Sequence, residues 1–240
     1  MSKVMLITGA SRGIGAATAR LAAGQGYRVI VNYQRNREAA EALGEALAAQ
    51  ADVADEAQVR RLFANIDERL GRLDVLVNNA GMLEQQMRLE RMSLERWQRV
   101  FATNVYGSFL CSREAIARMS TRQGGRGGAI INVSSIAARL GAPGEYIDYA
   151  AAKGAVDSMT VGLAKELADD GIRVNAVRPG VIDTEIHASG GEPQRVARVA
   201  ASIPLGRGGR AEEVAEAIIW LAGEQASYTT GSLLDVSGGR

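Results

Sequence analysis

Short apolar runs alternate along the chain with longer segments that have the period of a helix. The runs are nearly continuous in apolar residues, which is typical of strands buried on both faces of a parallel sheet. We predict strands within the ranges 4–10, 27–33, 46–53, 73–81, 128–135, 172–180 and 232–239. The third of these runs, "ALAAQADV", is the weakest.

The segments between these runs repeat apolar residues every three to four positions. Segment 56–71 is the clearest, with an apolar face formed by Val59, Leu62, Phe63, Ile66 and Leu70. Further helices are predicted around 12–26, 37–44, 93–103, 105–119, 149–170 and 211–223, whereas 181–210 is predicted to be irregular and polar. The alternation predicts an α/β fold with a seven-stranded parallel sheet covered by helices on both faces. No linker or repeat interrupts it, so we expect a single domain over residues 1–240.

The connection between the second and third predicted strands is short. Only about a dozen residues separate them, which is near the minimum for a parallel crossover. We therefore expect either a truncated helix in this connection or a third strand that is displaced from the sheet.

Composition and charge argue against several classes of function. The chain has 240 residues, 47% of them apolar, and a net charge of +1, so nothing favours a nucleic-acid or membrane-surface partner. A single cysteine, Cys111, rules out an internal disulfide and a cysteine cluster for zinc. No apolar run reaches the roughly 20 residues of a membrane span, and the first residues lack the layout of a signal peptide. We expect a cytoplasmic protein without a metal site.

The first predicted strand runs into the glycine-rich segment "TGASRGIG" at 8–15. Glycines between a strand and a helix let backbone amides and the helix N-terminus approach a pyrophosphate. The spacing is G-x-x-x-G-x-G, and a tight turn alone would also explain the three glycines. Their position at the first crossover favours a dinucleotide site. Its predicted contacts in this loop are Gly9, Ser11, Arg12, Gly13, Ile14 and Gly15.

The end of the second predicted strand indicates which dinucleotide binds. A carboxylate there would bind the ribose 2′-hydroxyl and repel a 2′-phosphate. The chain instead has Asn32, Tyr33 and Arg35, and Arg12 lies in the glycine loop. Two arginines without an acid favour NADP(H) over NAD(H). The alternative is that Arg35 points into water on a solvated turn, which leaves NAD(H) open.

Eight short motifs in order make the chain similar to the short-chain dehydrogenase/reductase family along essentially its whole length. They are "TGASRGIG" (8–15), "ADV" (51–53), "NNAG" (78–81), the asparagine of "ATNVYGS" (104), "NVSS" (132–135), "YAAAK" (149–153), "RVNAVRPG" (173–180) and the C-terminal "DVSGG". The resemblance implies a Rossmann-type, doubly wound sheet. It also implies hydride transfer between a nicotinamide and a carbonyl or alcohol.

The resemblance implies further cofactor contacts outside the glycine loop. They are Asp52 and Val53 at the adenine, Asn79, Ala80 and Gly81 within segment 78–81, and Pro179, Gly180, Val181 and Thr184 at the nicotinamide end. From the residues alone, "NNAG" is equally well explained as a turn that ends a strand.

Tyr149 and Lys153 are the candidate centre of the chemistry. They lie four residues apart, so they share one face of the predicted helix. A tyrosine can give a proton to a carbonyl oxygen, and a nearby cation would lower its pKa from about 10. Lys153 is therefore expected to lower the pKa of Tyr149 and to hold the nicotinamide ribose. A Tyr–Lys pair at this spacing also occurs by chance in many helices, so the pair depends on the neighbouring motifs.

Two further residues complete the predicted catalytic set. Ser134 and Ser135 both end the fifth strand, where a hydroxyl can hold the substrate oxygen. In the family pattern a glycine follows the catalytic serine by six positions, and Gly141 selects Ser135. The resemblance implies that Asn104 holds a water that relays protons from Lys153, and a capping or kinking role is the alternative.

His187 is the only histidine, in the segment "TEIHASGGEP". In the similar family this segment covers the substrate. We expect a polar residue on a flexible loop, with substrate contact as the alternative. The neighbouring Gly190 and Gly191 favour a mobile lid.

The function expected from these motifs is NADP(H)-dependent carbonyl reduction or alcohol oxidation. The chain also looks like sugar dehydrogenases and 3-oxoacyl-carrier-protein reductases of the same family. A protein that senses NADP(H) without turnover is the alternative from another class. Family members imply a homotetramer or homodimer, formed through helices 105–119 and 149–170 and the last strand.

Overall fold

The seven apolar runs form one parallel sheet in the computed structural model, which describes residues 2–44 and 46–240. The strands are β1 (Val4–Ile7), β2 (Arg28–Tyr33), β3 (Leu47–Gln50), β4 (Val75–Asn78), β5 (Gly128–Val133), β6 (Ile172–Pro179) and β7 (Leu233–Val236). Their order is β3-β2-β1-β4-β5-β6-β7, and every neighbouring pair is parallel. The predicted doubly wound α/β fold is confirmed.

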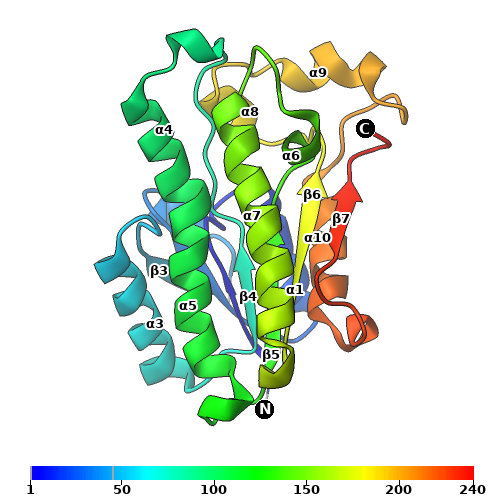
Figure 1. Ribbon diagram of the computed structural model, residues 1–240. Helices are drawn as coiled ribbons and strands as arrows, with labels where there is room; N and C mark the ends of the chain where they lie inside the picture. The colour runs from blue at the N-terminus through cyan, green and yellow to red at the C-terminus, as the bar shows by residue number, and fades with distance from the viewer. Residues whose placement is uncertain (1, 45) are drawn as a thin grey trace.

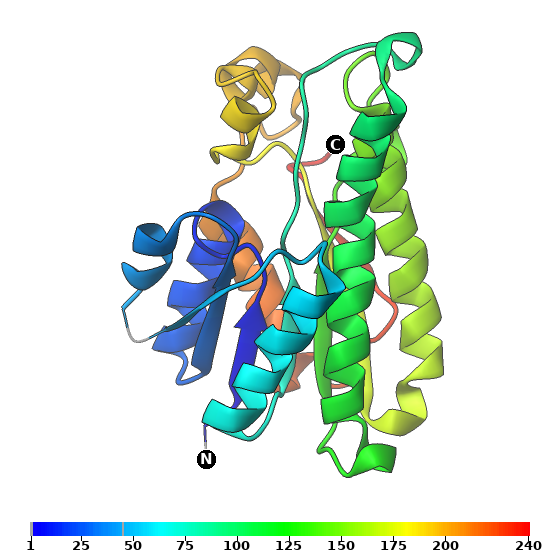
Figure 2. The same ribbon diagram turned by 90° about the vertical axis from the view of Figure 1, so that its left-hand side faces the viewer.

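Both faces of the sheet are covered by helices, so the strands are apolar on both sides. In β1, Met5 and Ile7 pack into the core beneath α1 (Gly13–Gly24) and α10 (Ala211–Ala222). Val4 and Leu6 pack into the core beneath α3 (Glu56–Leu70) and α5 (Gly107–Met119). Figure 2 shows these two helical layers on opposite sides of the sheet. This arrangement explains why the strands read as continuous apolar runs.

The helices largely match the segments with a helical period. They are α1 (Gly13–Gly24), α2 (Arg37–Glu41), α3 (Glu56–Leu70), α4 (Leu94–Phe101), α5 (Gly107–Met119), α6 (Ala137–Leu140), α7 (Ile147–Glu166), α8 (Ile186–Ser189), α9 (Arg195–Val199) and α10 (Ala211–Ala222). Within the described ranges, no helix combines the length and apolar character that crossing a bilayer requires.

The short connection after β2 contains a truncated helix, which is one of the two predicted alternatives. Helix α2 has five residues, and Asn36 caps it by accepting a hydrogen bond from the amide of Ala39. The other alternative, a third strand displaced from the sheet, is wrong. β3 pairs with β2 along its whole length, from Ile30 opposite Leu47 to Tyr33 opposite Gln50. One buried residue, Ala40, suffices to attach α2 to the core.

Two predictions of local structure need correction. The helices expected at 93–103 and 105–119 are one continuous rod, since α4 passes into α5 through a π-helical turn, η2 (Ala102–Tyr106). The segment 181–210 was expected to be irregular, but it contains α8, α9 and a 3₁₀ turn, η5 (Ala200–Ser202). These short helices form a cover over the carboxyl ends of β4, β5 and β6 (Figure 1), and we call residues 184–203 the lid.

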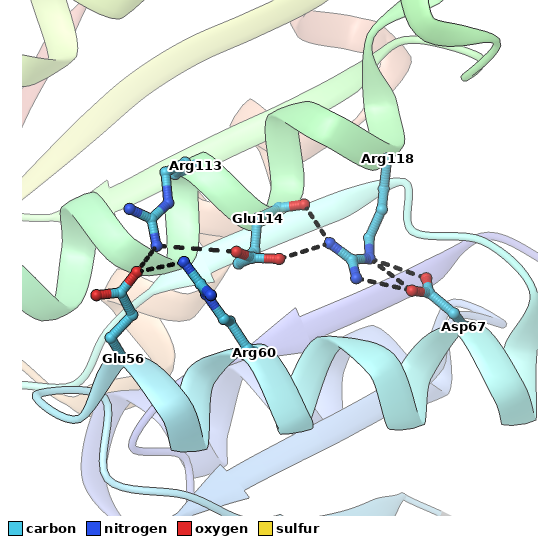
Figure 3. A network of polar contacts seen from close by, with 6 residues as sticks. All are labelled: Glu56, Arg60, Asp67, Arg113, Glu114 and Arg118. Atoms are coloured by element: carbon cyan, nitrogen blue, oxygen red, sulfur yellow. Dashed lines mark hydrogen bonds and ion pairs between the residues drawn. The ribbon is translucent and has the colours of Figure 1, made fainter.

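Surface charges join α3 to α5 side by side (Figure 3). Glu56 of α3 accepts a hydrogen bond from Arg113 at 2.6 Å, and Asp67 accepts one from Arg118 at 2.7 Å. Exposed ion pairs of this kind contribute little individually. The apolar core between the helices therefore supplies most of the packing energy.

A buried ion pair fixes the start of α7, the helix that carries Tyr149. Arg96 of α4 donates to Asp148 through Nε at 2.6 Å and Nη2 at 3.1 Å, and the two side chains are 4% and 1% exposed. Arg96 also donates to the carbonyl oxygen of Gln85 at 2.6 Å. Asp148 lies in the first turn of α7, where a negative charge is favourable.

We predict that Arg96→Ala lowers the free energy of unfolding by about 3–5 kcal/mol, because it leaves Asp148 buried without its partner. Arg99→Ala on the same helix is the matched control. Arg99 pairs with Glu84 but is 56% exposed, so its loss should cost less than about 1 kcal/mol. Urea unfolding followed by circular dichroism measures both values, and equal losses for the two variants would contradict the prediction.

Candidate active site

A cavity of about 1080 Å³ lies at the carboxyl ends of the strands and is bounded by the lid. This volume is at the upper end of the range for ligand pockets. The strand order changes direction between β1 and β4, and ligands in such sheets bind at that point. Of the residues predicted from the sequence, all line this cavity except Gly15 and Asn104.

The glycine loop has the shape that a phosphate cradle requires. Gly9 and Gly13 have φ values of +60° and +56°, which side chains disfavour. A Cβ on Gly9 would lie 2.8 Å from the Cα of Ala80. Helix α1 begins at Gly13 without a side-chain cap and without an acid in its first turn, which suits a bound anion.

Gly15 has a packing role instead of a lining role. A Cβ at this position would lie 2.5 Å from Nδ2 of Asn79 and 2.7 Å from the Cα of Ala10. Asn79 in turn donates to the carbonyl oxygens of Thr8 and Gly9 at 2.8 and 3.0 Å. Gly15 therefore lets β4 close against the glycine loop, which holds the cradle in shape.

Asn32 is mainly a structural residue, although it lines the cavity. Its side chain is 1% exposed. It accepts a hydrogen bond from the amide of Gly9 at 3.2 Å and donates to Ala49 and Ala51 at 3.2 and 3.0 Å. It thus joins the ends of β1, β2 and β3 in one network.

The predicted nucleotide-selecting residues lie on two segments of the cavity wall, Arg35 just after β2 and Arg12 in the glycine loop. Both are exposed. Arg12 donates to Oγ of Ser189 in the lid at 3.1 Å, so the glycine loop also contacts the lid. Asp52 accepts a hydrogen bond from Gln34 at 2.7 Å. Asp52 also accepts a hydrogen bond from the amide of Ala54 at 2.9 Å, so both of its carboxylate oxygens are engaged.

Tyr149 lies in the first turn of α7, and its phenol shares the cavity wall with Ser135. Burial raises the pKa of Tyr149 to about 12, and hydrogen bonding to Ser135 opposes this shift. The structure therefore differs from the expected lowering of the pKa by Lys153. A phenol with this pKa keeps its proton at neutral pH, which suits a proton donor.

Lys153 is 4% exposed, and its ammonium group ends beside the Tyr149 ring. Nζ lies 5.5 Å from the ring centroid and donates to the carbonyl oxygen of Val133 at 2.8 Å. Burial lowers the pKa of Lys153 to about 8, and the charge of Asp157, one turn further along α7, opposes the shift. Arg178 of β6 holds Asp157 by a 2.8 Å ion pair.

Of the two candidate serines, Ser135 is the one beside Tyr149. Ser134 is 2% exposed, and its hydroxyl donates to the backbone carbonyl of Lys153 at 3.2 Å. That bond ties the end of β5 to α7. Ser135 Oγ accepts a hydrogen bond from the amide of Ala137 at 3.1 Å, which fixes the hydroxyl at the cavity.

Asn104 lies in the π-helical turn η2 and is fully buried. Its Oδ1 accepts from the amide of Met82 at 3.2 Å, and its Nδ2 donates to Met82 and Val100 carbonyls at 3.1 and 2.9 Å. A Cβ on Gly81 would lie 2.9 Å from Asn104 Oδ1 and 3.6 Å from Lys153 Nζ. Asn104 therefore stands behind Gly81, close to Lys153. It lies in a π turn, and such turns are frequent at functional sites.

His187 is not the exposed loop residue that the sequence suggested. It lies in α8, is 8% exposed and lines the cavity. The reason is local: the short helix α8 folds the segment back over the cavity, so the ring packs inward.

Sequence reasoning missed many residues of the cavity wall, among them Glu145, Tyr146 and Arg195. Arg195 donates to Glu145 at 2.5 Å, and its guanidinium lies 5.1 Å from the centroid of the Tyr146 ring. Glu145 and Tyr146 fall just before the predicted Tyr149 helix. Nothing in the sequence pattern indicates that Arg195, fifty residues away, meets them.

These residues fit a nicotinamide dinucleotide. The uncapped start of α1 and the glycines with positive φ can hold a pyrophosphate. Tyr149, Ser135 and Lys153 line another part of the same cavity. Cys111 takes no part, because it is fully buried and its thiol pKa is raised to about 12.

Comparison with known proteins agrees with the site. Residues 9–240 match the family model described as "Enoyl-(Acyl carrier protein) reductase". The chain is 56% identical over 245 residues to the uncharacterized oxidoreductase YgfF of Escherichia coli (strain K12), covering 99% of both chains. It is 43% identical over 248 residues to a 3-oxoacyl-[acyl-carrier-protein] reductase of Synechocystis sp. (strain ATCC 27184 / PCC 6803 / Kazusa), covering 99% of this chain and 96% of the relative.

A solved structure is also similar. The 3-ketoacyl-(acyl-carrier-protein) reductase from Brucella melitensis, complexed with NADH, superposes with a TM-score of 0.92 at 35% identity, and the match covers 99% of this chain and 98% of that one. The chain belongs to the short-chain dehydrogenase/reductase family and is a nicotinamide-dependent oxidoreductase that acts on hydroxyl or keto groups.

Proposed function

We propose that the protein is an NADP(H)-dependent carbonyl reductase or alcohol dehydrogenase with Tyr149 as its acid and base. The observation that carries the proposal is the meeting of Tyr149, Ser135 and the buried Lys153 at one wall of the cavity. The family relationship supports the reaction class. The roles of the individual residues are our inference from their geometry and charge.

In this mechanism the chain positions the substrate and moves one proton. The nicotinamide supplies or accepts the hydride when bound. Ser135 donates a hydrogen bond to the substrate oxygen, and Tyr149 gives its phenolic proton to that oxygen. The Lys153 ammonium stabilises the phenolate that remains. Asn104 lies behind Gly81, close to Lys153, where it holds a water that returns a proton.

We infer that the residues of the glycine loop hold the pyrophosphate and that Arg35, with Arg12, holds a 2′-phosphate. Two exposed guanidinium groups of the cavity wall, Arg35 just after β2 and Arg12 in the glycine loop, support NADP(H). The solved relative was crystallised with NADH, so NAD(H) is the alternative that the kinetics must compare. Asp52, Val53, Asn79, Ala80, Gly81, Pro179, Gly180, Val181 and Thr184 line the same cavity and complete the proposed cofactor site.

Two alternative functions follow from the relatives and the sequence. The names of the cyanobacterial and Brucella relatives favour a 3-oxoacyl-carrier-protein reductase, and a sugar dehydrogenase is the other alternative. A protein that only senses NADP(H) is disfavoured, because it would not need a buried lysine beside a protonated tyrosine.

We propose that the chain assembles as a homotetramer or homodimer in the cytoplasm. Large apolar side chains are exposed on two separate faces, which monomers rarely leave uncovered. They are Tyr106 and Phe109 at 57% and 51% on one face, and Trp220 and Leu234 at 45% and 37% near the last strand. Sedimentation velocity at micromolar concentration measures the assembly, and a single monomer boundary would contradict it.

Tyr149→Phe should lower kcat for carbonyl reduction by about 100- to 10,000-fold, because the proton donor is lost while the cavity keeps its shape. The measurement is NADPH and NADH oxidation against diketones, aldehydes, keto-esters and sugars. Tyr228→Phe, which removes a phenol from a fully exposed side chain outside the cavity lining, is the matched control. Activity that survives Tyr149→Phe rejects the proposed mechanism.

Carbonyl reduction should decline as the pH rises through about 8, where Lys153 loses the charge that stabilises the phenolate. Because Asp157 raises the pKa of Lys153, Asp157→Asn should move this decline to lower pH. The pH profile of kcat/KM measures the midpoint. Asp169→Asn, an acid with an 82% exposed side chain, is the control and should leave it in place. An unmoved midpoint in Asp157→Asn would show that Lys153 does not set the profile.

Arg35→Asp should raise the KM for NADPH at least about tenfold and favour NADH, since a carboxylate repels a 2′-phosphate and can bind a 2′-hydroxyl. The ratio of kcat/KM for the two cofactors is the readout. Arg37→Asp is a matched charge reversal on an exposed residue that lies outside the cavity lining. Equal ratios in wild type and Arg35→Asp would remove Arg35 from the cofactor site.

A further inference from the structure

The first residues of the lid lie directly on the glycine loop. A Cβ on Gly13 would lie 3.4 Å from the side-chain methyl group of Thr184 and 3.8 Å from Oε2 of Glu185. Gly13 is the first residue of α1, and the start of α1 has no side-chain cap. The amide groups at the start of a helix lack partners within the helix and attract anions. The lid therefore brings a carboxylate close to the uncapped start of α1.

Two hydrogen bonds hold this part of the lid in place. Arg12, the residue before α1, donates through Nη2 to Oγ of Ser189 at 3.1 Å. The Ser189 hydroxyl in turn donates to the backbone carbonyl oxygen of Glu185 at 3.1 Å. The backbone of Glu185 is thus tied to the glycine loop through Ser189. Its carboxylate lies near the loop because of this backbone position as well as its side-chain conformation.

The charge of Glu185 is not balanced by a partner. Three acids line the cavity, namely Asp52, Glu145 and Glu185. Both carboxylate oxygens of Asp52 accept hydrogen bonds, and Glu145 is paired with Arg195. The Glu185 carboxylate forms no hydrogen bond or ion pair within residues 2–44 and 46–240, and the residue is exposed to the cavity. Its negative charge therefore acts on any group that occupies the start of α1.

A pyrophosphate at the glycine loop would meet this charge. Phosphate groups bind at helix starts because the amide groups there are unpaired and the helix dipole favours a negative charge. Two like charges about 4 Å apart repel enough to weaken binding about fivefold even at the dielectric constant of water. The Glu185 carboxylate and a pyrophosphate therefore compete for the same end of α1.

We propose that Glu185 is an autoinhibitory residue of the cofactor site. With the lid on the glycine loop, its carboxylate takes the place beside α1 that a pyrophosphate needs, and a dinucleotide must displace it to bind. This inference rests on the proposed function, because it concerns the dinucleotide site assigned there. It adds a residue that weakens cofactor binding and that couples the start of the lid to the occupancy of the glycine loop.

Glu185→Gln tests the proposal, since it removes the charge and keeps nearly the same shape. We expect this variant to lower the Kd for NADPH and for NADH about fivefold, and equally, because the pyrophosphate is common to both. Titration of the nicotinamide fluorescence measures both constants. Asp183→Asn is the matched control, because Asp183 is an exposed acid two residues away that lies outside the cavity lining. It should change either Kd less than about twofold.

Two further measurements separate an effect of charge from an effect of shape. ADP-ribose contains the pyrophosphate without the nicotinamide, so calorimetry with ADP-ribose should show the same gain in affinity for Glu185→Gln. The gain should shrink when the salt concentration is raised from about 50 mM to about 500 mM, because ions screen the repulsion. A changed lid shape would give a gain that salt does not alter.

Three results would overturn the proposal: no gain in affinity for Glu185→Gln, a gain confined to NADPH, or a gain independent of salt. The proposed function can fail separately. If wild type binds the cofactors but reduces none of the carbonyl compounds, the ratio of Kd values still decides the role of Glu185. If wild type binds neither cofactor nor ADP-ribose, the assigned dinucleotide site is wrong and this inference fails with it.

Discussion

The site depends on burying the ammonium group of Lys153, and much of the surrounding structure compensates for that burial. An isolated charge inside a protein is strongly destabilising unless it is paired and hydrogen-bonded. The carbonyl oxygen of Val133, 2.8 Å from Nζ, accepts a hydrogen bond from the ammonium group. The charge of Asp157, one turn along α7, favours its charged form. Arg178 of β6 in turn pairs with Asp157. β6 therefore stabilises the charged Lys153 indirectly, through Asp157.

The ends of β4, β5 and β6 are arranged around the same requirement. Ser134 fixes α7 to β5 through the carbonyl of Lys153, and Asn78 and Asn132 hydrogen-bond between neighbouring strands at 2.9 Å. Asn132 donates further to Thr160 on α7, also at 2.9 Å. This buried polar chain positions the helix that carries Tyr149 and Lys153. Asn78 Oδ1 has no hydrogen-bond partner among the described residues, so the network is satisfied only in part.

Much of the fold could be predicted from the sequence, because apolar runs and helical periods report burial directly. The seven strands and the truncated α2 follow from those patterns, as does the position of the glycine loop. The π-helical turn at Asn104 could not be predicted, since its residues continue the helical pattern on both sides. The sequence predicted a lid from Gly190 and Gly191 but not its helices, because α8 and α9 are too short to show a period.

The residues of the cavity wall likewise fall into two groups. A local sequence pattern predicts some of them, and contacts between distant segments place the others. Tyr149 and Lys153 were recognisable because they lie four positions apart on one helix and accompany the glycine loop and the "NVSS" strand end. The contact of Arg195 with Glu145 and Tyr146 joins segments fifty residues apart, and no local pattern encodes it. His187 shows the same division, since the sequence placed it in a polar loop while α8 buries it at the cavity wall. The lid and the segment before α7 meet through Arg195 and Glu145, a contact that only the folded arrangement reveals.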